Sequence, residues 1–196
     1  LAYKIAEKTK IPFNINETQM MVINSEIDTQ YFATPKSVQD FNKSFVFRWA
    51  YSDKDGDKSN KPITNWEDIV SKFLMIPMAH QMIGDYVVID EAENPENRRH
   101  MLMRPYQVYA LREVEKAALG TDDTRIAHGG FVWHTTGSGK TITSFKTALF
   151  LLKRGDFHKI IFLVDRKDLD DQTSSRFKAY ATYDNITVDD TEYTYE

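Results

Sequence analysis

The sequence predicts an α/β fold whose C-terminal half carries a parallel sheet. Short apolar segments at 129–133 and 159–165 flank a helical pattern at 141–155. A strand, a helix and a strand in this order imply a right-handed crossover, and therefore parallel strands. A further helix is expected over 169–180, where the alternation continues.

The N-terminal half is expected to begin with short strands. Residues 19–33 hold two apolar runs separated by NSEID, a pattern typical of a hairpin. Residues 44–51 place an aromatic side chain at every second position from Phe45 to Tyr51, as a half-buried strand does.

The polar stretch 52–62 is expected to be a loop. Its DKDGD letters invite comparison with a calcium-binding EF-hand loop, which needs Gly at position six and Glu at position twelve. Counting from Asp53, those places hold Lys58 and Thr64. A solvated turn is therefore the favoured interpretation.

Apolar residues at helical spacing predict helices at 65–75 and 104–120. The first helix is expected to end before Pro77. The second of these helices has Pro105 in its first turn and Gly120 as its C-terminal stop, both at favoured positions.

The polar, Pro-containing stretch around 91–100 is interpreted as part of a linker. The expected organisation is an N-terminal piece over 1–80, a linker over 81–103 and a second domain over 104–196.

Composition excludes some classes of protein and leaves others open. The 196 residues include no Cys, which excludes disulfides and Cys-based zinc sites, and the five His show no metal-ligand spacing. The net charge of -4 argues against a dedicated basic nucleic-acid-binding domain, although a motor can grip DNA with a few local groups. With no leader peptide and no apolar run near ~20 residues, a cytoplasmic protein without a membrane partner is expected.

A phosphate-binding loop is predicted in the segment HTTGSGKT. Gly137 and Gly139 let main-chain N–H groups turn inward, and the helix that follows adds unpaired donors and a favourable dipole. Lys140 would reach the terminal phosphates and Thr141 would ligate Mg²⁺. The full phosphate-loop pattern has Gly where this chain has His134, which is interpreted as a side chain packed beside the loop.

Gln107 lies upstream in RPYQ, just inside its predicted helix. A Gln amide can form two hydrogen bonds to the N6 and N7 edge of adenine, so Gln107 could select adenine. From its chemistry alone, it could equally be a surface residue.

Three segments in order, RPYQ, HTTGSGKTITSFK and FLVDRKDLDDQ, resemble the Q motif, motif I and motif Ia of superfamily 2 helicases. More narrowly, the chain resembles the motor and restriction subunit of type I restriction enzymes, through the His before TTGSGKT, TSFK after it, and VDRKDLDDQ. The resemblance implies a partial RecA-like P-loop sheet, preceded by the C-terminal part of an α+β nuclease-like domain.

The resemblance also implies roles for individual residues. Lys140 and Thr141 are the catalytic candidates, with Thr141 on Mg²⁺, and Arg166 and Gln172 would lie toward the DNA. The residues implied to bind ATP are Arg104, Gln107, Thr136, Gly137, Ser138, Gly139, Lys140 and Thr141.

In proteins of the resembled family, ATP hydrolysis pulls duplex DNA past the complex, and a separate nuclease domain cuts it. The implied partners are duplex DNA and the methylation and specificity subunits. No DEAD- or DEAH-like pair follows Thr141 and no nuclease ExK motif is found, so the chain is expected to be a fragment that is inactive by itself.

Asp90 and Glu91 end an apolar run and look like magnesium-holding carboxylates. Motors of the resembled class carry those carboxylates after the phosphate loop, whereas this pair precedes even Gln107. The pair is therefore interpreted as a strand end.

Other functions remain open from the residues alone. They are another superfamily 2 DNA or RNA helicase, a small P-loop kinase, for which no acceptor-binding lid is found, and an assembly module that holds nucleotide only structurally or not at all.

Overall fold

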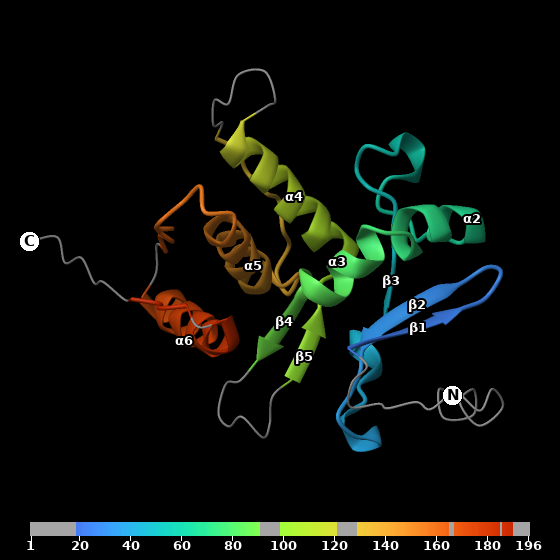
Figure 1. Ribbon diagram of the computed structural model, residues 1–196, viewed down its shortest axis with the longest axis horizontal. Coiled ribbons are helices and arrows are strands. Elements are labelled where there is room, and N and C mark those ends of the chain that lie inside the picture. The colour runs from blue at the N-terminus through green and yellow to red at the C-terminus, as the bar shows by residue number, and fades with distance from the viewer. Residues whose placement is uncertain (1–18, 91–98, 121–128, 165–166, 185, 190–196) are drawn as a thin grey trace, which may run out of the picture.

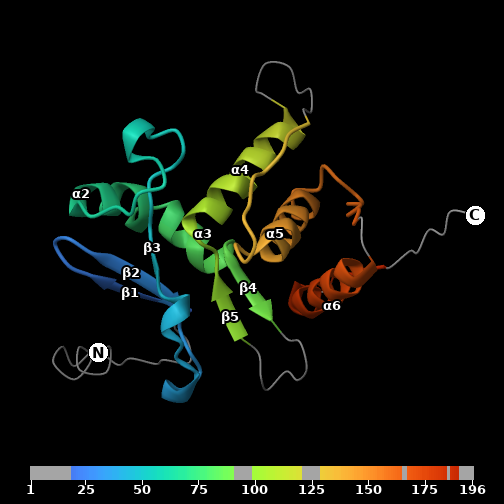
Figure 2. The same ribbon diagram turned by 180° about the vertical axis from the view of Figure 1, so that it is seen from behind.

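The computed structural model describes residues 19–90, 99–120, 129–164, 167–184 and 186–189. They form a mixed α/β arrangement (Figures 1 and 2). Strands β1, β2 and helix α2 lie on one side, helices α5 and α6 lie on the other, and α3, α4 and the β4–β5 pair lie between them.

The predicted N-terminal hairpin is confirmed. β1 (Met20–Asn24) pairs antiparallel with β2 (Thr29–Ala33), and the main-chain N–H of Ser25 donates to the oxygen of Asp28 at 2.8 Å in the turn. β3 (Phe47–Arg48) adds antiparallel to β2 and completes a three-stranded sheet.

The strand expected over 44–51 is shorter than predicted. Residues Lys43–Phe45 form a 3-10 turn, and only β3 pairs with β2. Beyond β3 the chain changes partner, because the N–H of Ile63 donates to the oxygen of Trp49 at 2.9 Å and the N–H of Tyr51 to that of Lys61 at 3.0 Å. Trp49 is fully buried, whereas Phe45 is 40% exposed.

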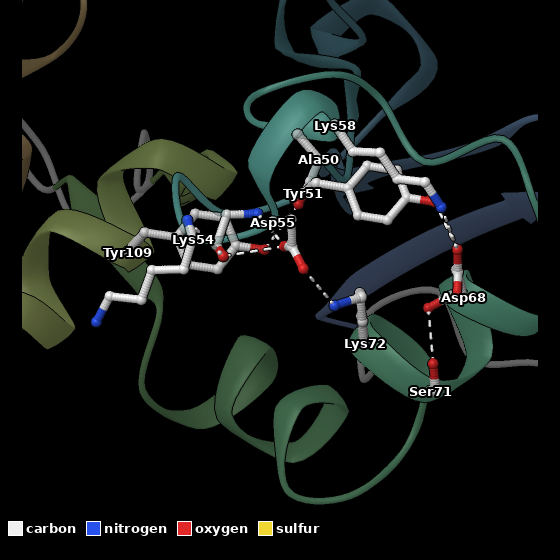
Figure 3. A network of polar contacts seen from close by, with 10 residues as sticks. Ala50, Tyr51, Lys54, Asp55, Lys58, Asp68, Ser71, Lys72 and Tyr109 are labelled. Carbon is white, nitrogen blue, oxygen red and sulfur yellow. Dashed lines mark hydrogen bonds and ion pairs between the residues drawn. The ribbon is translucent and has the colours of Figure 1, made fainter.

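The loop at 52–62 is tied to the helical segment that follows it (Figure 3). Asp55 accepts a hydrogen bond from Lys72 at 3.0 Å, and the Tyr51 hydroxyl donates to Asp68 at 2.5 Å. That hydrogen bond raises the pKa of Tyr51 to about 12. Asp55 is thus engaged in holding the loop.

The helix predicted at 65–75 is confirmed as α2 (Trp66–Ile69) continued by the π-helical turn η5 (Val70–Leu74). The Asn65 side chain caps its start by accepting from the N–H groups of Glu67 and Asp68 at 2.8 and 3.0 Å. α3 (Met78–Gly84) follows Pro77.

The described part of the predicted linker, 81–90 and 99–103, carries regular secondary structure. β4 (Val87–Asp90) and β5 (Arg99–Leu102) form an antiparallel pair, with β4 ending at Asp90 as expected. Apolar side chains in these ranges enter the core. The buried ones are Met82, Tyr86, Val88, Leu102 and Met103.

Three helices of the C-terminal half are confirmed. They are α4 (Pro105–Leu119), which ends at Gly120 with a φ of 78°, α5 (Lys140–Lys153) and α6 (Lys167–Asp184). None of the described helices combines the length and the apolar character needed to cross a membrane.

The parallel sheet predicted around these helices is not formed in the described residues. Residues 129–133 and 159–164 have no strand structure, and Phe131, Trp133 and Leu163 are 91%, 86% and 86% exposed. A strand needs a neighbour to accept and donate its main-chain hydrogen bonds. The nearby strands β4 and β5 pair with each other and leave these segments without such a neighbour in the described chain.

Two apolar clusters hold the elements together. The larger joins the N-terminal sheet to α4, through side chains that include Tyr31, Trp49, Phe73, Val108 and Leu111. The smaller packs β4 against α5 and α6. The Tyr31 hydroxyl also donates to the main-chain oxygen of Met103 at 2.9 Å.

Candidate nucleotide-binding site

A tight turn precedes helix α5, where the phosphate loop is predicted. The Ser138 main-chain N–H and hydroxyl both donate to the oxygen of Thr135, at 3.3 and 2.7 Å. Gly137 and Gly139 adopt φ values of 76° and 81°, in the left-handed region that favours glycine. The glycines of GSG therefore meet a backbone requirement of this turn.

The loop delivers Lys140 and Thr141 to the first turn of α5. Within the described part of the chain, no acceptor is found for the main-chain N–H groups of Gly139, Lys140 and Thr141. The Lys140 ammonium is exposed and donates to the main-chain oxygen of His134 at 3.3 Å. Free amides, a cation and a hydroxyl at a helix N-terminus fit a polyphosphate chain with its magnesium ion.

Gln107 reaches this loop from the first turn of α4 and is only 3% exposed. Its Oε1 accepts from the main-chain N–H of Arg104 at 2.8 Å, and its Nε2 donates to the oxygens of Ser138 and Gly139 at 2.9 and 3.3 Å. In this arrangement, the Gln107 amide braces the phosphate loop.

Tyr106 supports the same turn and was missed by sequence reasoning. Its hydroxyl donates to the oxygen of Ser138 at 2.8 Å and accepts from the Arg104 guanidinium at 3.2 Å. That guanidinium also lies over the ring of Phe47, 4.8 Å from its centre. In the sequence, the position of Tyr106 next to Gln107 in RPYQ was the only signal of this role. The contact itself could not be inferred, because Tyr106 and Ser138 lie far apart in the chain.

His134 packs beside the loop, as predicted. Its ring meets the Tyr106 ring edge-on, with the ring centres 5.6 Å apart. Burial, together with the nearby Lys140 ammonium, lowers the pKa of His134. Both effects favour the neutral imidazole.

An open groove of about 1350 Å³ runs along one side of the loop. Its walls come from the N-terminal sheet, from α4 and from the segment that leads into the loop, and include Phe47, Arg104, Tyr106, Trp133 and Thr136. The groove thus offers aromatic faces and a guanidinium next to the predicted phosphate site.

Of the two residues predicted to face DNA, only Gln172 is among the described residues. Gln172 is an exposed residue of α6, and Arg166 falls outside the described residues. No group of three or more His, Cys, Asp or Glu arranged for a metal ion is found in the ranges that the structure covers.

Lys146, on the inner face of α5, was also missed. It is 5% exposed, and its ammonium donates to the main-chain oxygen of Val87 in β4 at 2.8 Å. Burial lowers the pKa of Lys146 to about 8. The helix that carries Lys140 and Thr141 is thereby attached to the β4–β5 pair.

Known proteins resemble this chain over the site and beyond it. Residues 106–194 match the SWI2/SNF2 ATPase family. The chain is 40% identical over 163 residues to the type I restriction enzyme SauCOLORF180P endonuclease subunit of Staphylococcus aureus (strain COL). The aligned residues cover 83% of this chain and 16% of that protein. The chain is also similar to the C-terminal part of the putative type I restriction enzyme MpnIIP endonuclease subunit of Mycoplasma pneumoniae (strain ATCC 29342 / M129 / Subtype 1). The identity to that part is 35% over 130 residues, covering 63% of this chain and 60% of the matched protein.

A shorter match, 35% identical over 88 residues, is to the type I restriction enzyme EcoKI endonuclease subunit of Escherichia coli (strain K12), covering 44% of this chain and 7% of that protein. The chain thus spans 16% of the length of the staphylococcal relative. On an identity of 40% that covers 83% of its residues, the chain belongs to the family of type I restriction enzyme endonuclease subunits, and it carries a helicase-like SWI2/SNF2 ATPase segment.

Proposed function

We propose that this chain binds ATP with Mg²⁺ as the first part of the motor of a DNA-translocating type I restriction endonuclease. The observation that carries the proposal is the loop from Thr136 to Thr141, which Gln107 braces and which brings amides that are free in the described chain, an ammonium group and a hydroxyl to the start of α5. Those groups match the oxygens and the bound metal ion of a triphosphate.

We propose a role for each residue of the site. The loop from Thr136 to Thr141 holds the triphosphate, with the amides of Gly139, Lys140 and Thr141, free in the described chain, donating to phosphate oxygens. Lys140 neutralises the phosphate charge, and Thr141 supplies a hydroxyl to the metal ion. Bound Mg²⁺ would offset the charge that develops on the transferred phosphoryl group.

Arg104 and Gln107 are proposed to contact the adenine. Because Nε2 of Gln107 holds the oxygens of Ser138 and Gly139 here, contact with a base requires it to leave at least one of them. Base recognition and the shape of the phosphate loop would then be linked through one side chain.

The remaining roles concern the whole subunit. We propose that residues 104–196 begin a RecA-like domain and that residues 1–80 end a nuclease-like domain, with 81–103 between the two. In the RecA-like domain, residues 129–133 and 159–165 would become strands of a parallel sheet. The exposed side chains of Phe131 and Leu163 support the proposed strands, because such apolar surface is usually covered in a folded protein. Arg166 and Gln172 are proposed to lie toward duplex DNA, and the methylation and specificity subunits to be partners.

Replacing Lys140 tests the function. In the assembled restriction complex, Lys140→Ala is expected to lower ATP hydrolysis and ATP-dependent DNA cleavage by about 100-fold or more, the scale of loss for a group that stabilises phosphoryl charge. The matched control is Lys153→Ala at the other end of α5, where the lysine is 59% exposed and pairs with Asp184 at 2.6 Å. Full cleavage by Lys140→Ala would refute the motor proposal and favour a non-catalytic assembly module.

A further inference from the structure

Two side chains from the first turn of α4 meet at one carbonyl of the phosphate loop. The oxygen of Ser138 accepts from the Tyr106 hydroxyl at 2.8 Å and from Nε2 of Gln107 at 2.9 Å. A carbonyl oxygen has two lone pairs, so both of its acceptor positions are used. The Ser138 carbonyl is therefore held facing α4.

The orientation of this carbonyl decides where the next amide points. The peptide between Ser138 and Gly139 is planar and trans, so its N–H points opposite to its C=O. The Gly139 N–H is thus turned away from α4. That N–H directly precedes Lys140 and is one of the groups proposed to hold phosphate.

The peptide needs such a restraint because of its neighbours. Gly137 and Gly139 lie on both sides of Ser138, and glycine adopts alternative backbone angles at little cost. With only Gln107 attached, the peptide could rotate about a single hydrogen bond. A second donor from a different direction removes that freedom.

Tyr106 is itself held in place at two points. The Arg104 guanidinium donates to its hydroxyl at 3.2 Å, and its ring lies edge-on to the ring of His134, 5.6 Å between centres. Tyr106 therefore contacts the phosphate loop at His134, where the loop begins, and at Ser138, near its end.

We infer that Tyr106 is a positioning residue for polyphosphate, acting through the Ser138–Gly139 peptide, an inference that rests on the proposed nucleotide site. The hydroxyl orients the Gly139 amide toward the phosphates before any ligand arrives. Gln107 also restrains this peptide, but it would lose at least one of its hydrogen bonds to the loop when its side chain contacts a base. Tyr106 would then be the restraint that remains in the nucleotide-bound state.

The test uses Tyr106→Phe, which keeps the ring and removes only the hydroxyl. Calorimetry on the full chain would measure the Kd of inorganic tripolyphosphate, of Mg-ATP and of adenosine. Both phosphate ligands are expected to bind about 3- to 10-fold more weakly, the effect of losing one neutral hydrogen bond. Adenosine, which has no phosphate, is expected to bind as it does to the unchanged protein.

The matched control is Tyr109→Phe on the same helix. The Tyr109 hydroxyl also donates to one main-chain oxygen, that of Ala50, at 2.7 Å. Both substitutions remove the same kind of hydrogen bond, so similar small falls in melting temperature are expected. Only Tyr106→Phe is expected to weaken tripolyphosphate binding.

Three results would overturn the inference. They are unchanged tripolyphosphate binding by Tyr106→Phe, equal weakening by both Phe variants, and equal weakening for tripolyphosphate and adenosine. Failure of the proposed function would give a different result, because neither the unchanged protein nor Lys140→Ala would then bind tripolyphosphate.

Discussion

Gly139 meets two requirements that only a hydrogen side chain satisfies. Its φ of 81° lies in the left-handed region, and a Cβ atom at this position would overlap Nε2 of Gln107. The motif glycine is thus needed for the backbone angle and for the close approach of the Gln107 side chain.

Gly139→Ala is therefore expected to displace Gln107 from the loop and to strain the start of α5. The expected result is a loss of about 1–3 kcal/mol in the free energy of unfolding, with tripolyphosphate binding abolished. Urea unfolding and calorimetry would measure the two effects. In contrast, Gly84→Ala, where a Cβ meets no atom within 4 Å and φ is ordinary, is expected to be neutral or slightly stabilising. Normal binding by Gly139→Ala would show that Gln107 does not need this close contact.

Between elements, the buried Lys146 links α5 to β4. Burial is the largest cause of its lowered pKa, which is about 8 instead of 10.5, and Lys153 adds to the lowering, whereas Asp184 and Asp85 oppose it. In the unfolded chain, this lysine stays protonated up to the higher value. Between the two pKa values the unfolded state binds more protons than the folded state, so the free energy of unfolding rises with pH.

The expected rise is about 2 kcal/mol from about pH 7.5 to about pH 9.5, at 1.36 kcal/mol per pKa unit. Urea unfolding across that range would measure it, and Lys146→Met should flatten the curve. Lys116→Met, at a lysine of α4 that is 66% exposed, should leave the curve as it is. The range stops below pH 10, where the raised pKa values of tyrosines such as Tyr86 would change stability in the opposite direction. A flat curve for the unchanged protein would mean that Lys146 is not buried in the folded state.

At the scale of the whole molecule, the N-terminal sheet and α4 share one core. Trp49 is fully buried and stacks on Phe73 with ring centres 4.8 Å apart, and its ring meets that of Tyr109 in α4 edge-on at 5.7 Å. The two regions therefore pack against each other through one shared cluster of buried side chains. They are expected to unfold together.

Trp49→Ala is expected to lower the free energy of unfolding by about 3–5 kcal/mol, the cost of removing a large buried aromatic ring. Trp66→Ala, at an α2 residue that is 55% exposed, is expected to cost less than about 1 kcal/mol. Amide hydrogen exchange should show faster exchange in β2 and in α4 of the Trp49 variant. Faster exchange in β2 alone would indicate two independent units and would support a domain boundary near residue 80.

The sequence by itself determined the hairpin, the turn before α5 and the helices other than the short α3, which it did not predict. The capping Asn65, Pro105 at the start of α4 and Gly120 at its end act within a few residues of their own position. The same holds for the glycines of GSG, whose backbone angles are a local requirement. Hydrogen bonds that close within a segment can be inferred from that segment.

Only the tertiary structure decided which distant groups meet. It joined Tyr106 to Ser138, Lys146 to Val87 and Tyr31 to Met103, and it placed residues 81–90 in the core. Among the described residues, it also left 129–133 without the strand pairing that their apolar character predicts. The physical reason is that strand pairs and side-chain braces need a partner from elsewhere in the chain, and no local pattern of residues specifies that partner.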